Sequence, residues 1–267
     1  MKLSIITITY NDSEGFSRTL DSLRVLLGAP ELAGEWEHIV VDSSPEINSS
    51  VLSRLGSWPL VRIETPPRGI YPAFNLGLEH ATGEFVWFLN GGDRLLNVEN
   101  LRGLLDSFGS ADLVCAPVEI YRNGKFTYNS HVKDNFSANL MGQNNLCHQG
   151  IIYRRSVFDC VGFYDVSYKL AGDYEHHFKC FFNGMKAGVF AGAIAQYDRD
   201  GRSDNFREVF GEYRRVWSKW SSNLGKQMYF QNIFIGKVYF FRSELMKSKL
   251  LYPISGQLKK LWYRMNR

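Results

Sequence analysis

The sequence predicts an α/β fold with a mixed central sheet and a C-terminal helical appendage. Strand-like segments alternate with segments of helical periodicity over the first part of the chain, as expected for a parallel sheet. The apolar run Phe85–Leu89, bounded by Gly83 and Gly91, has the length and flanks of a strand that is buried on both faces. The Asn123-Gly124 pair between two strand-like segments then predicts a β-hairpin, which ends the alternation.

The composition, 45% hydrophobic and 22% charged residues, is that of an ordinary soluble protein. No run approaches the ~20 consecutive apolar residues of a membrane span. Met1 leads directly into strand-like sequence without a signal-peptide pattern. We therefore expect a cytoplasmic protein.

The four cysteines form no Cys-x-x-Cys pair and have apolar neighbours. A zinc cluster or a disulfide framework is therefore not expected. We predict core thiols at Cys115, Cys147, Cys160 and Cys180.

The first element is a β-branched strand, Leu3–Thr9, which runs into a turn at Tyr10-Asn11. This turn contains no Gly-x-Gly-x-x-Gly, so a pyrophosphate cannot approach the backbone closely, which argues against a dinucleotide-dependent dehydrogenase. Either Asp12 or Ser13 can cap the following helix. Apolar residues at helical spacing mark that helix: Phe16, Leu20, Leu23 and Leu27.

A second strand, His38–Val41, ends in Asp42, and a third is predicted at Leu60–Glu64 after a helix-like segment at 49–56. Asp42 has the chemistry to accept hydrogen bonds from a base or a ribose. It is equally suited to capping a turn, and the residues alone do not decide between the two.

The break Pro66–Gly69 precedes a predicted helix over 70–81, in which Pro72 fits the first turn. Its apolar residues recur at four-residue spacing. Asn75 is the polar exception near the predicted ligand-binding edge, where its amide can both donate and accept a hydrogen bond. A solvated helix residue is the alternative interpretation.

Asp93 follows the buried strand through Asn90-Gly91-Gly92 and therefore lies at a strand's carboxyl end. In open α/β sheets ligands bind at that edge. A carboxylate beside glycine backbone suits a hydrated cation that carries phosphates. For an isolated Gly-Gly-Asp, a simple turn would be the better interpretation.

Two further polar positions lie in the second half, beyond a predicted helix near 98–107 and strands at 113–121 and 126–128. His148, with Gln149, precedes a strand-like segment and either is a core histidine or shapes an acceptor site. Asp173 lies at the start of a helix, where it either caps the helix or is a carboxylate stabilised by the helix N-terminus and opposed by Glu175.

A last strand is predicted at Val189–Ala195, followed by a charged loop that ends near Ser203. Arg199 and Arg202 in this loop can pair with a diphosphate, although a solvated loop fits the local sequence equally well. Apolar and aromatic residues at helical spacing over 206–220 then predict a helix.

The segment 226–267 carries nine lysines and arginines and one acid, Glu244, for a net charge of +8. Since the whole chain carries +4, residues 1–225 carry −4. Basic and aromatic residues together suggest a surface that contacts anionic lipid. A helical appendage that packs on the protein core is a close alternative, and no nucleic-acid-binding motif accompanies the cations, so nucleic acid is not expected as a partner.

With these positions assembled, residues 1–205 resemble family 2 glycosyltransferases, in particular bacterial enzymes of exopolysaccharide or O-antigen synthesis. The resemblance implies a Rossmann-like nucleotide-diphospho-sugar transferase fold of the GT-A type. It depends on six motifs in this order: Ser4-Ile5-Ile6-Thr7-Ile8-Thr9-Tyr10-Asn11, Val40-Val41-Asp42-Ser43, Gly69-Ile70-Tyr71-x-Ala73-x-Asn75-x-Gly77, Phe88-Leu89-Asn90-Gly91-Gly92-Asp93, His148-Gln149 and Gly172-Asp173-Tyr174.

The resemblance also implies roles for single residues. Asp173 would be the catalytic base, and Asp93 would bind a divalent cation, Mg²⁺ or Mn²⁺, with the diphosphate. The implied donor site comprises Thr9, Tyr10, Asn11, Asp42, Arg68, Asn75, Asn90, Gly91 and Gly92. The implied acceptor site or phosphate loop comprises His148, Gln149, Arg199, Arg202 and Ser203.

The resemblance divides the chain into a catalytic domain, 1–205, and a helical region, 206–267. The donor half of the catalytic domain would span about 1–110 and the acceptor half about 111–205. Two departures stand out: the metal motif retains one carboxylate, Asp93, and Gly172 replaces a glutamate that often precedes the base.

The leading hypothesis is an inverting hexosyltransferase of surface polysaccharide biosynthesis at the cytoplasmic membrane face. Its donor would be a nucleotide-diphosphate sugar, and its acceptor a saccharide or a lipid-linked saccharide. Because the metal motif is thinned, a sugar-nucleotide-binding or assembly subunit without activity of its own is the alternative.

Overall fold

The structure is a computed structural model that describes residues 2–29, 34–44, 51, 53, 58–140, 146–198 and 206–247. The chain forms two compact units. The first comprises Met1–Leu140 and Asn144–Gly201, and the second comprises Met141–Gln143 and Arg202–Arg267.

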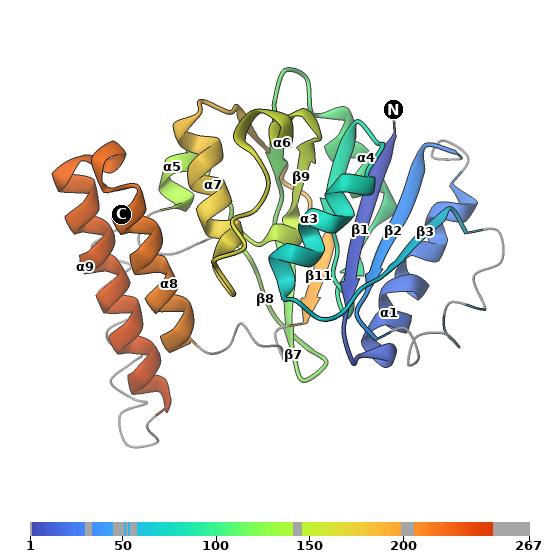
Figure 1. The fold of residues 1–267 in the computed structure, drawn as a ribbon, viewed down its shortest axis with the longest axis horizontal. Helices are drawn as coiled ribbons and strands as arrows, with labels where there is room; N and C mark the ends of the chain where they lie inside the picture. The colour runs from blue at the N-terminus through green and yellow to red at the C-terminus, as the bar shows by residue number, and fades with distance from the viewer. Residues whose placement is uncertain are drawn as a thin grey trace. The chain divides into compact units, whose positions relative to one another are not determined.

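A seven-stranded sheet forms the centre of the first unit (Figure 1). Its order is β10-β6-β9-β4-β1-β2-β3, and β9 runs antiparallel to both of its neighbours while the other pairs are parallel. The predicted mixed sheet is thus present. The strands are β1 (Leu3–Thr9), β2 (Trp36–Asp42), β3 (Leu60–Glu64), β4 (Phe85–Phe88), β6 (Leu113–Cys115), β9 (Ile151–Arg154) and β10 (Ala187–Val189).

A second sheet of four strands has the order β5-β11-β7-β8. The hairpin predicted at Asn123-Gly124 joins β7 to β8, and Asn123 adopts a positive φ of 49° there. The strands are β5 (Arg94–Leu95), β7 (Val118–Arg122), β8 (Lys125–Asn129) and β11 (Ala195–Asp198).

The strand predicted as continuous at 113–121 is divided between the two sheets. The strand predicted at 189–195 is wrong over most of its length, because β10 ends at Val189 and β11 begins at Ala195. The first is interrupted at Pro117, which has no N–H to donate, so that β6 and β7 join different sheets. The segment that pairs with it, from β10 to β11, also passes from one sheet to the other, because β10 pairs with β6 and β11 pairs with β7. Gly192 lies in this crossover, where a Cβ would come within 2.7 Å of the Phe190 ring.

Helices cover both faces of the central sheet. Figure 1 shows α3 (Ile70–His80) in front of β1. It packs closely because Gly77 faces Ile6, whose methyl lies 2.5 Å from where a Cβ would be. The opposite face carries the apolar sides of α1 (Ser13–Leu23) and α4 (Val98–Asp106). Among the described residues, this unit also contains the helical elements η1 (Arg24–Gly28), α5 (Phe136–Asn139), η3 (His148–Gly150), α6 (Ser156–Val161) and α7 (Gly172–Phe182).

The core confirms the prediction that the run at 85–89 is a strand buried on both faces, since all four residues of β4 and the following Leu89 are buried. Asp12, not Ser13, caps α1 and accepts the N–H of Gly15. The helix predicted at 49–56 lies almost entirely outside the described residues.

The prediction of core thiols is wrong for one cysteine. Cys115 and Cys180 are buried and Cys147 is partly buried, but Cys160 is exposed. Helix α6 turns Val157 and Phe158 inward, and Cys160, two residues further, therefore lies on its outer side.

The described part of the second unit, 206–247, forms the helices α8 (Phe206–Lys219) and α9 (Ser221–Lys247), and Gly225 interrupts α9 with a non-helical φ of 70°. Trp217 is fully buried, and its ring occupies the space beside Gly236, where a Cβ would lie 2.4 Å away. The glycine therefore lets the two helices approach. Among the described residues of the chain, no helix is long and apolar enough to cross a membrane.

Candidate active site

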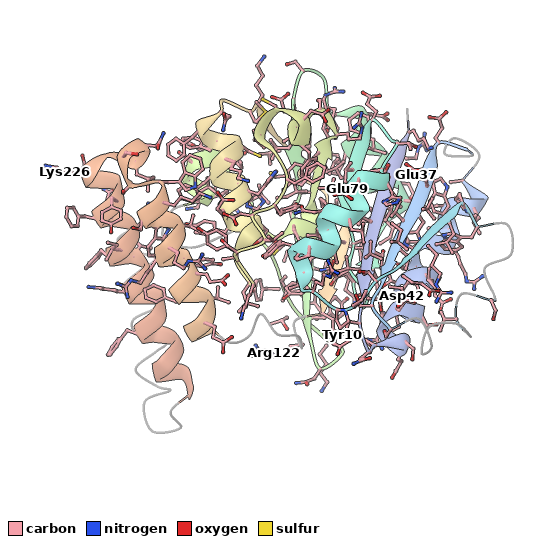
Figure 2. All side chains as sticks on the ribbon, viewed as in Figure 1. Tyr10, Glu37, Asp42, Glu79, Arg122 and Lys226 are labelled. Carbon is pink, nitrogen blue, oxygen red and sulfur yellow. The ribbon has the colours of Figure 1, made fainter. Side chains whose placement is uncertain are left out.

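Three predicted site residues lie at the carboxyl ends of β1 and β2. Parallel pairing places Thr9 opposite Asp42, and Tyr10 follows Thr9 directly. Figure 2 shows Tyr10 and Asp42 at the same edge of the sheet, whereas Glu37 lies at the other end of β2. Tyr10 is 46% exposed, so its ring is available for stacking against a ligand.

Asp42 is fully buried and held from two sides. Its Oδ1 accepts the backbone N–H of Ser44 at 3.0 Å, and its Oδ2 lies 3.3 Å from the guanidinium of Arg62. Asn11 has a positive φ of 51° and donates its backbone N–H to the hydroxyl of the same Ser44 at 2.9 Å. Asp42 and Asn11 therefore belong to one hydrogen-bonded corner of the sheet.

Arg62 is a residue of this corner that the sequence did not point to. It lies on β3, in register with Val40 of β2. Its one signal in the sequence is a cation within an apolar strand. Arg68, predicted for donor binding, is exposed in the segment between β3 and α3.

The turn Asn90–Asp93 follows β4 and requires both of its glycines. Gly91 donates its N–H to the carbonyl of Ile8 at 3.0 Å, and a Cβ on it would lie 3.3 Å from that oxygen and from Oγ1 of Thr9. Gly92 has a φ of 103°, which side chains other than hydrogen rarely tolerate. The turn therefore approaches the end of β1 as closely as the backbone allows.

The side chain of Thr19 on α1 forms hydrogen bonds with this turn, although nothing in the sequence marked Thr19 as a site residue. Its buried hydroxyl accepts the N–H of Gly92 at 2.9 Å and donates to the carbonyl of Asp93 at 2.7 Å. The same oxygen lies 3.1 Å from the carbonyl of Asn90. One hydroxyl thus satisfies backbone groups from both ends of the turn.

Asp93 is buried, and its Oδ2 accepts hydrogen bonds from Nε2 of Gln149 at 3.0 Å and from the N–H of Asn90 at 3.3 Å. The pKa of this carboxyl is raised to about 7, mainly by burial and also by the nearby charge of Asp198 on β11, against the lowering effect of its hydrogen bonds. Asp198 is therefore a second carboxylate beside Asp93. Sequence reasoning missed it because the two residues are brought together only by the second sheet.

His148 and Gln149 lie against the turn, and their predicted role in an acceptor site stays a prediction. Nδ2 of Asn90 and Nε2 of His148 are 2.9 Å apart. Burial lowers the pKa of the imidazole to about 4, so the neutral ring accepts the amide hydrogen bond. Nε1 of Trp87 on β4 fixes the segment by donating to the carbonyl of Gln149 at 2.8 Å.

The residues around the turn fit a hard divalent cation. The buried oxygens Oγ1 of Thr9 and Oδ1 of Asn90 find no hydrogen-bond partner among the described residues. Together with Asp93 and Asp198 they are the kind of ligands that Mg²⁺ and Mn²⁺ prefer, with water and phosphate completing the shell. Three acidic, histidine or cysteine side chains do not converge on one point in the described ranges, so such an ion would depend partly on its ligand's phosphates.

Asp173 lies in the first turn of α7. The alternative that it caps the helix is wrong, because the N-cap is Ala171 and Asp173 is the second helical residue. Its Oδ1 accepts the hydroxyl of Tyr71 at 3.2 Å and the N–H of Tyr174 at 2.8 Å. Burial and the charge of Asp173 raise the pKa of the Tyr71 hydroxyl well above its usual range, so it remains a donor.

The structure also explains the glycine that precedes Asp173. A Cβ on Gly172 would lie 2.7 Å from the ring of Tyr71. The aromatic ring therefore occupies the space that a side chain at position 172 would need.

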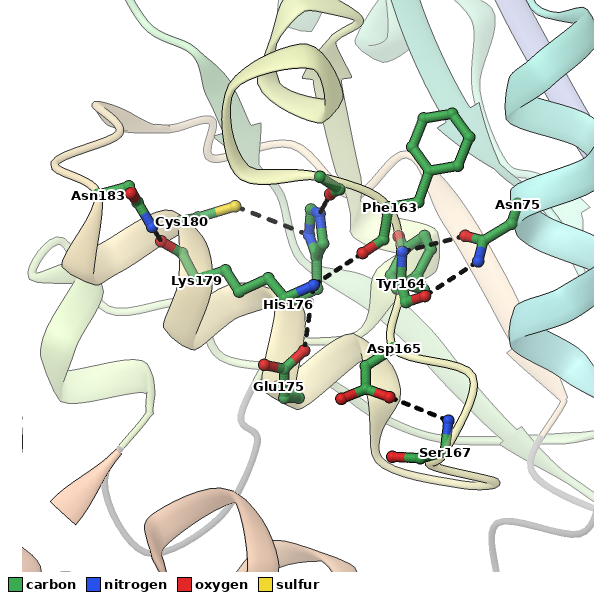
Figure 3. Close-up of polar contacts among 11 residues, drawn as sticks. Asn75, Phe163, Tyr164, Asp165, Ser167, Glu175, His176, Lys179, Cys180 and Asn183 are labelled. Atoms are coloured by element: carbon green, nitrogen blue, oxygen red, sulfur yellow. Dashed lines mark hydrogen bonds and ion pairs between the residues drawn. The ribbon is translucent and has the colours of Figure 1, made fainter. Parts of the chain in front are cut away.

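Asn75 lies one turn after Tyr71 on α3. Its Nδ2 donates to the carbonyl of Tyr164 at 2.9 Å, and its Oδ1 accepts the N–H of the same residue at 3.0 Å (Figure 3). Its amide thus holds backbone of the segment before α7. A role in donor binding stays a prediction, as do the roles of Arg199, Arg202 and Ser203, which lie outside the described residues.

The chain is similar in sequence and in fold to known glycosyltransferases. The profile described as Glycosyl transferase family 2 matches residues 4–162. A PGL/p-HBAD biosynthesis glycosyltransferase of Mycobacterium bovis is 29% identical over 211 residues, which cover 76% of this chain and 78% of that protein.

Solved structures show the same fold. The crystal structure of S. aureus TarS 1-349 in complex with UDP-GlcNAc aligns with a TM-score of 0.64 and 21% identity over 94% of this chain and 74% of that one. In another TarS 1-349 structure the match spans 65% of that chain, slightly under two thirds. The mannosyltransferase PcManGT from Pyrobaculum calidifontis, in complex with GDP-Man and Mn²⁺, aligns with a TM-score of 0.64 and 17% identity over 96% of this chain and 73% of that one. These likenesses confirm the predicted fold class.

Proposed function

Because the chain belongs to glycosyl transferase family 2, we propose that it is an inverting hexosyltransferase. Its donor is a nucleotide-diphosphate sugar, and its acceptor is a hydroxyl of a saccharide or a lipid-linked saccharide in exopolysaccharide or O-antigen synthesis. The observation that carries this proposal is the pair of separately built carboxylate sites. Asp93 lies in a glycine turn at the ligand-binding edge, and Asp173 lies at a helix start with two hydrogen-bond donors.

Asp173 acts as the general base. The N-terminus of α7, the hydroxyl of Tyr71 and the N–H of Tyr174 all stabilise negative charge on its carboxylate. As the acceptor oxygen attacks the anomeric carbon, its proton passes to Asp173. The bond between that carbon and the diphosphate oxygen breaks, and its electron pair leaves with the nucleoside diphosphate. A single displacement of this kind inverts the anomeric configuration.

The corner at the ends of β1 and β2 binds the nucleotide. The exposed ring of Tyr10 stacks on the base, while the buried Asp42, held by Arg62, accepts a hydrogen bond from it. Thr9 and Asn11 border the base. Arg68 and the turn residues Asn90, Gly91 and Gly92 lie toward the diphosphate. The donor complexes of TarS with UDP-GlcNAc and of PcManGT with GDP-Man support this class of donor.

A divalent cation would be held by Asp93, assisted by Asp198 and by the unpartnered oxygens of Thr9 and Asn90. When bound, it would neutralise the negative charge that accumulates on the departing diphosphate. Mn²⁺ in the PcManGT complex supports this cofactor. Asp198 also weakens the case for an inactive binding subunit, because that alternative depended on Asp93 being the single carboxylate at the turn.

The substitution Asp173→Asn tests the catalytic proposal. It keeps both hydrogen bonds within reach but removes the base, so transfer should fall about 10²- to 10⁴-fold. Donor binding, measured by isothermal titration with UDP-, GDP- and dTDP-sugars, should persist. Full transfer in this variant would contradict the assignment of the base, and donor binding without transfer by the unmodified protein would favour the inactive subunit.

The second unit offers a surface for a membrane, which would place the enzyme at the inner face of the cell membrane. Phe230, Phe234 and Phe241 of α9 are 63%, 62% and 61% exposed, and their spacing of four and seven residues sets them on one face of the helix. Lys237 lies on the same face, where its ammonium can reach lipid phosphates above the inserted rings. The net charge of +8 over 226–267 favours an anionic surface.

Vesicle flotation of the full-length chain tests this surface. Replacing Phe230, Phe234 and Phe241 by serine should abolish flotation with vesicles that contain anionic lipid. Phe126→Ser combined with Tyr128→Ser, which removes two exposed aromatic side chains of β8, is the matched control and should float normally. Equal flotation of both variants would overturn the proposed surface.

A further inference from the structure

We propose that Tyr71 of α3 is a positioning residue for Asp173, and that Asn75 supports it from one turn further along the same helix. The inference rests on the proposed role of Asp173 as the base. It assigns to Asn75 a task shared with Tyr71, in place of the predicted contact of Asn75 with the donor.

The hydroxyl of Tyr71 fixes one oxygen of the carboxylate. It donates to Oδ1 of Asp173 at 3.2 Å, while the N–H of Tyr174 reaches the same atom at 2.8 Å. Two donors on one oxygen restrict rotation of the carboxylate and so fix the direction in which it can take the acceptor's proton. The Tyr71 side chain is itself buried, so the direction from which its hydroxyl donates is fixed.

The ring of Tyr71 fixes the start of α7. It lies against Gly172, where any side chain would collide with it, and it packs on the ring of Tyr164 with centroids 5.6 Å apart. Helix α7 therefore begins at a position that the ring determines. A residue larger than glycine at 172 would move either the ring or Asp173.

Asn75 supports the ring of Tyr71 indirectly, through Tyr164. Tyr71 and Asn75 are four residues apart and so lie on the same face of α3. The paired hydrogen bonds of Asn75 to the backbone of Tyr164 keep the Tyr164 ring against Tyr71 (Figure 3). On α7, Lys179 donates to the carbonyl of Phe163 at 2.8 Å, which ties the same segment to the helix.

The charge of Asp173 affects the pKa of three buried tyrosines. Tyr71, Tyr164 and Tyr153 each interact electrostatically with it, and burial raises the pKa of all three hydroxyls well above the usual range. Glu175 lies two residues further along α7 and is paired with Lys179 at 3.7 Å. Loss of the Tyr71 hydrogen bond should therefore appear in the acidic limb of the activity profile.

The test is Tyr71→Phe, which removes the hydroxyl and keeps the ring on Gly172. We expect kcat to fall about 10- to 100-fold with KM for the donor unchanged, because the base is held less accurately. The acidic limb of the kcat profile should move up by roughly one pH unit, since the carboxylate loses a donor. Tyr121→Phe on β7 is the matched control, because its hydroxyl donates to the carboxylate of Glu119 and not to Asp173.

Gly172→Ala provides a second variant. If Tyr71 and Gly172 act on the same carboxylate, their effects on kcat should be clearly non-additive in the double variant. Tyr71→Phe with normal kcat and an unmoved acidic limb would overturn the inference. If Asp173→Asn is inactive in the same assay, the assignment of the base survives that result, so the two failures are distinguishable.

Asn75→Ala separates the two roles of that side chain. As a support for Tyr164, its loss should lower kcat and leave donor affinity within about twofold of normal, as the Tyr71 variant does. A large fall in donor affinity with kcat unchanged would instead make Asn75 a donor-binding residue and overturn its part in the inference.

Discussion

The Asn90–Asp93 turn and the start of α7 each present a carboxylate, but they are constructed differently. The turn is marked locally by its two glycines, and it is held by the carbonyl of Ile8 on the adjacent strand and by the hydroxyl of Thr19 on α1. The start of α7 has little local support, because Ala171 provides no side-chain cap. Its carboxylate is oriented by Tyr71, which is 102 residues away in the chain.

Because the two carboxylates are held by different contacts, we expect them to respond to different substitutions. Asp93 is buried and has the charge of Asp198 nearby, and in the proposed mechanism it helps to hold a cation. Asp173 is partly exposed, and in the proposed mechanism it receives a proton. A substitution at one site should therefore leave the other site's binding or ionisation behaviour intact.

Asp93→Asn should have the largest effect on the comparison. The carboxamide keeps a group that can accept from Gln149 but loses the negative charge, so transfer should fall about 10²- to 10³-fold. The thermal shift caused by Mn²⁺ with a nucleoside diphosphate should also disappear. Asp173→Asn is the matched substitution and should retain that shift, whereas an equal loss in both variants would contradict the division of tasks.

The sequence predicted the turn better than the helix start for a physical reason. Glycines and a strand end are local signals, so Asp93 and its edge could be placed without knowing any contact. Arg62, Thr19 and Asp198 could not be found in this way, because each acts through a partner on another strand or helix. The ends of the strands predicted at 113–121 and 189–195 were missed for the same reason, since tertiary pairing decided where each strand ended.

Acidification should destabilise the fold through its buried histidines, and burial lowers the pKa of His38 to about 3 and that of His148 to about 4. His176 and His177 are buried on α7, and burial lowers the pKa of His176 from 6.5 to about 3 and that of His177 well below its usual value. Because the folded protein favours the neutral rings, their stabilising contribution is complete above pH 6.5 and is lost as the pH falls. At pH 5 the free energy of unfolding should be lower by about 2 kcal/mol for each ring.

Urea unfolding between pH 8 and pH 5 measures this loss. His176→Gln should reduce the slope of stability against pH, while His80→Gln removes an exposed histidine of α3 and serves as the matched control. Equal slopes in the two variants would show that the α7 histidines are not responsible for the loss of stability at low pH.

Thr19→Val should have the smallest effect and bears on the turn alone. Valine has nearly the shape of threonine but no hydroxyl, so the N–H of Gly92 loses its acceptor and the carbonyl of Asp93 loses a donor. Buried groups left unpaired cost about 1–2 kcal/mol of stability. We expect a fewfold weaker response to Mn²⁺ and nucleoside diphosphate, with the acidic limb of the kcat profile unmoved because Asp173 is untouched. Thr19→Ser, which keeps the hydroxyl, should behave nearly as the unmodified protein; a shifted acidic limb in Thr19→Val would show that the two carboxylate sites are coupled through the fold.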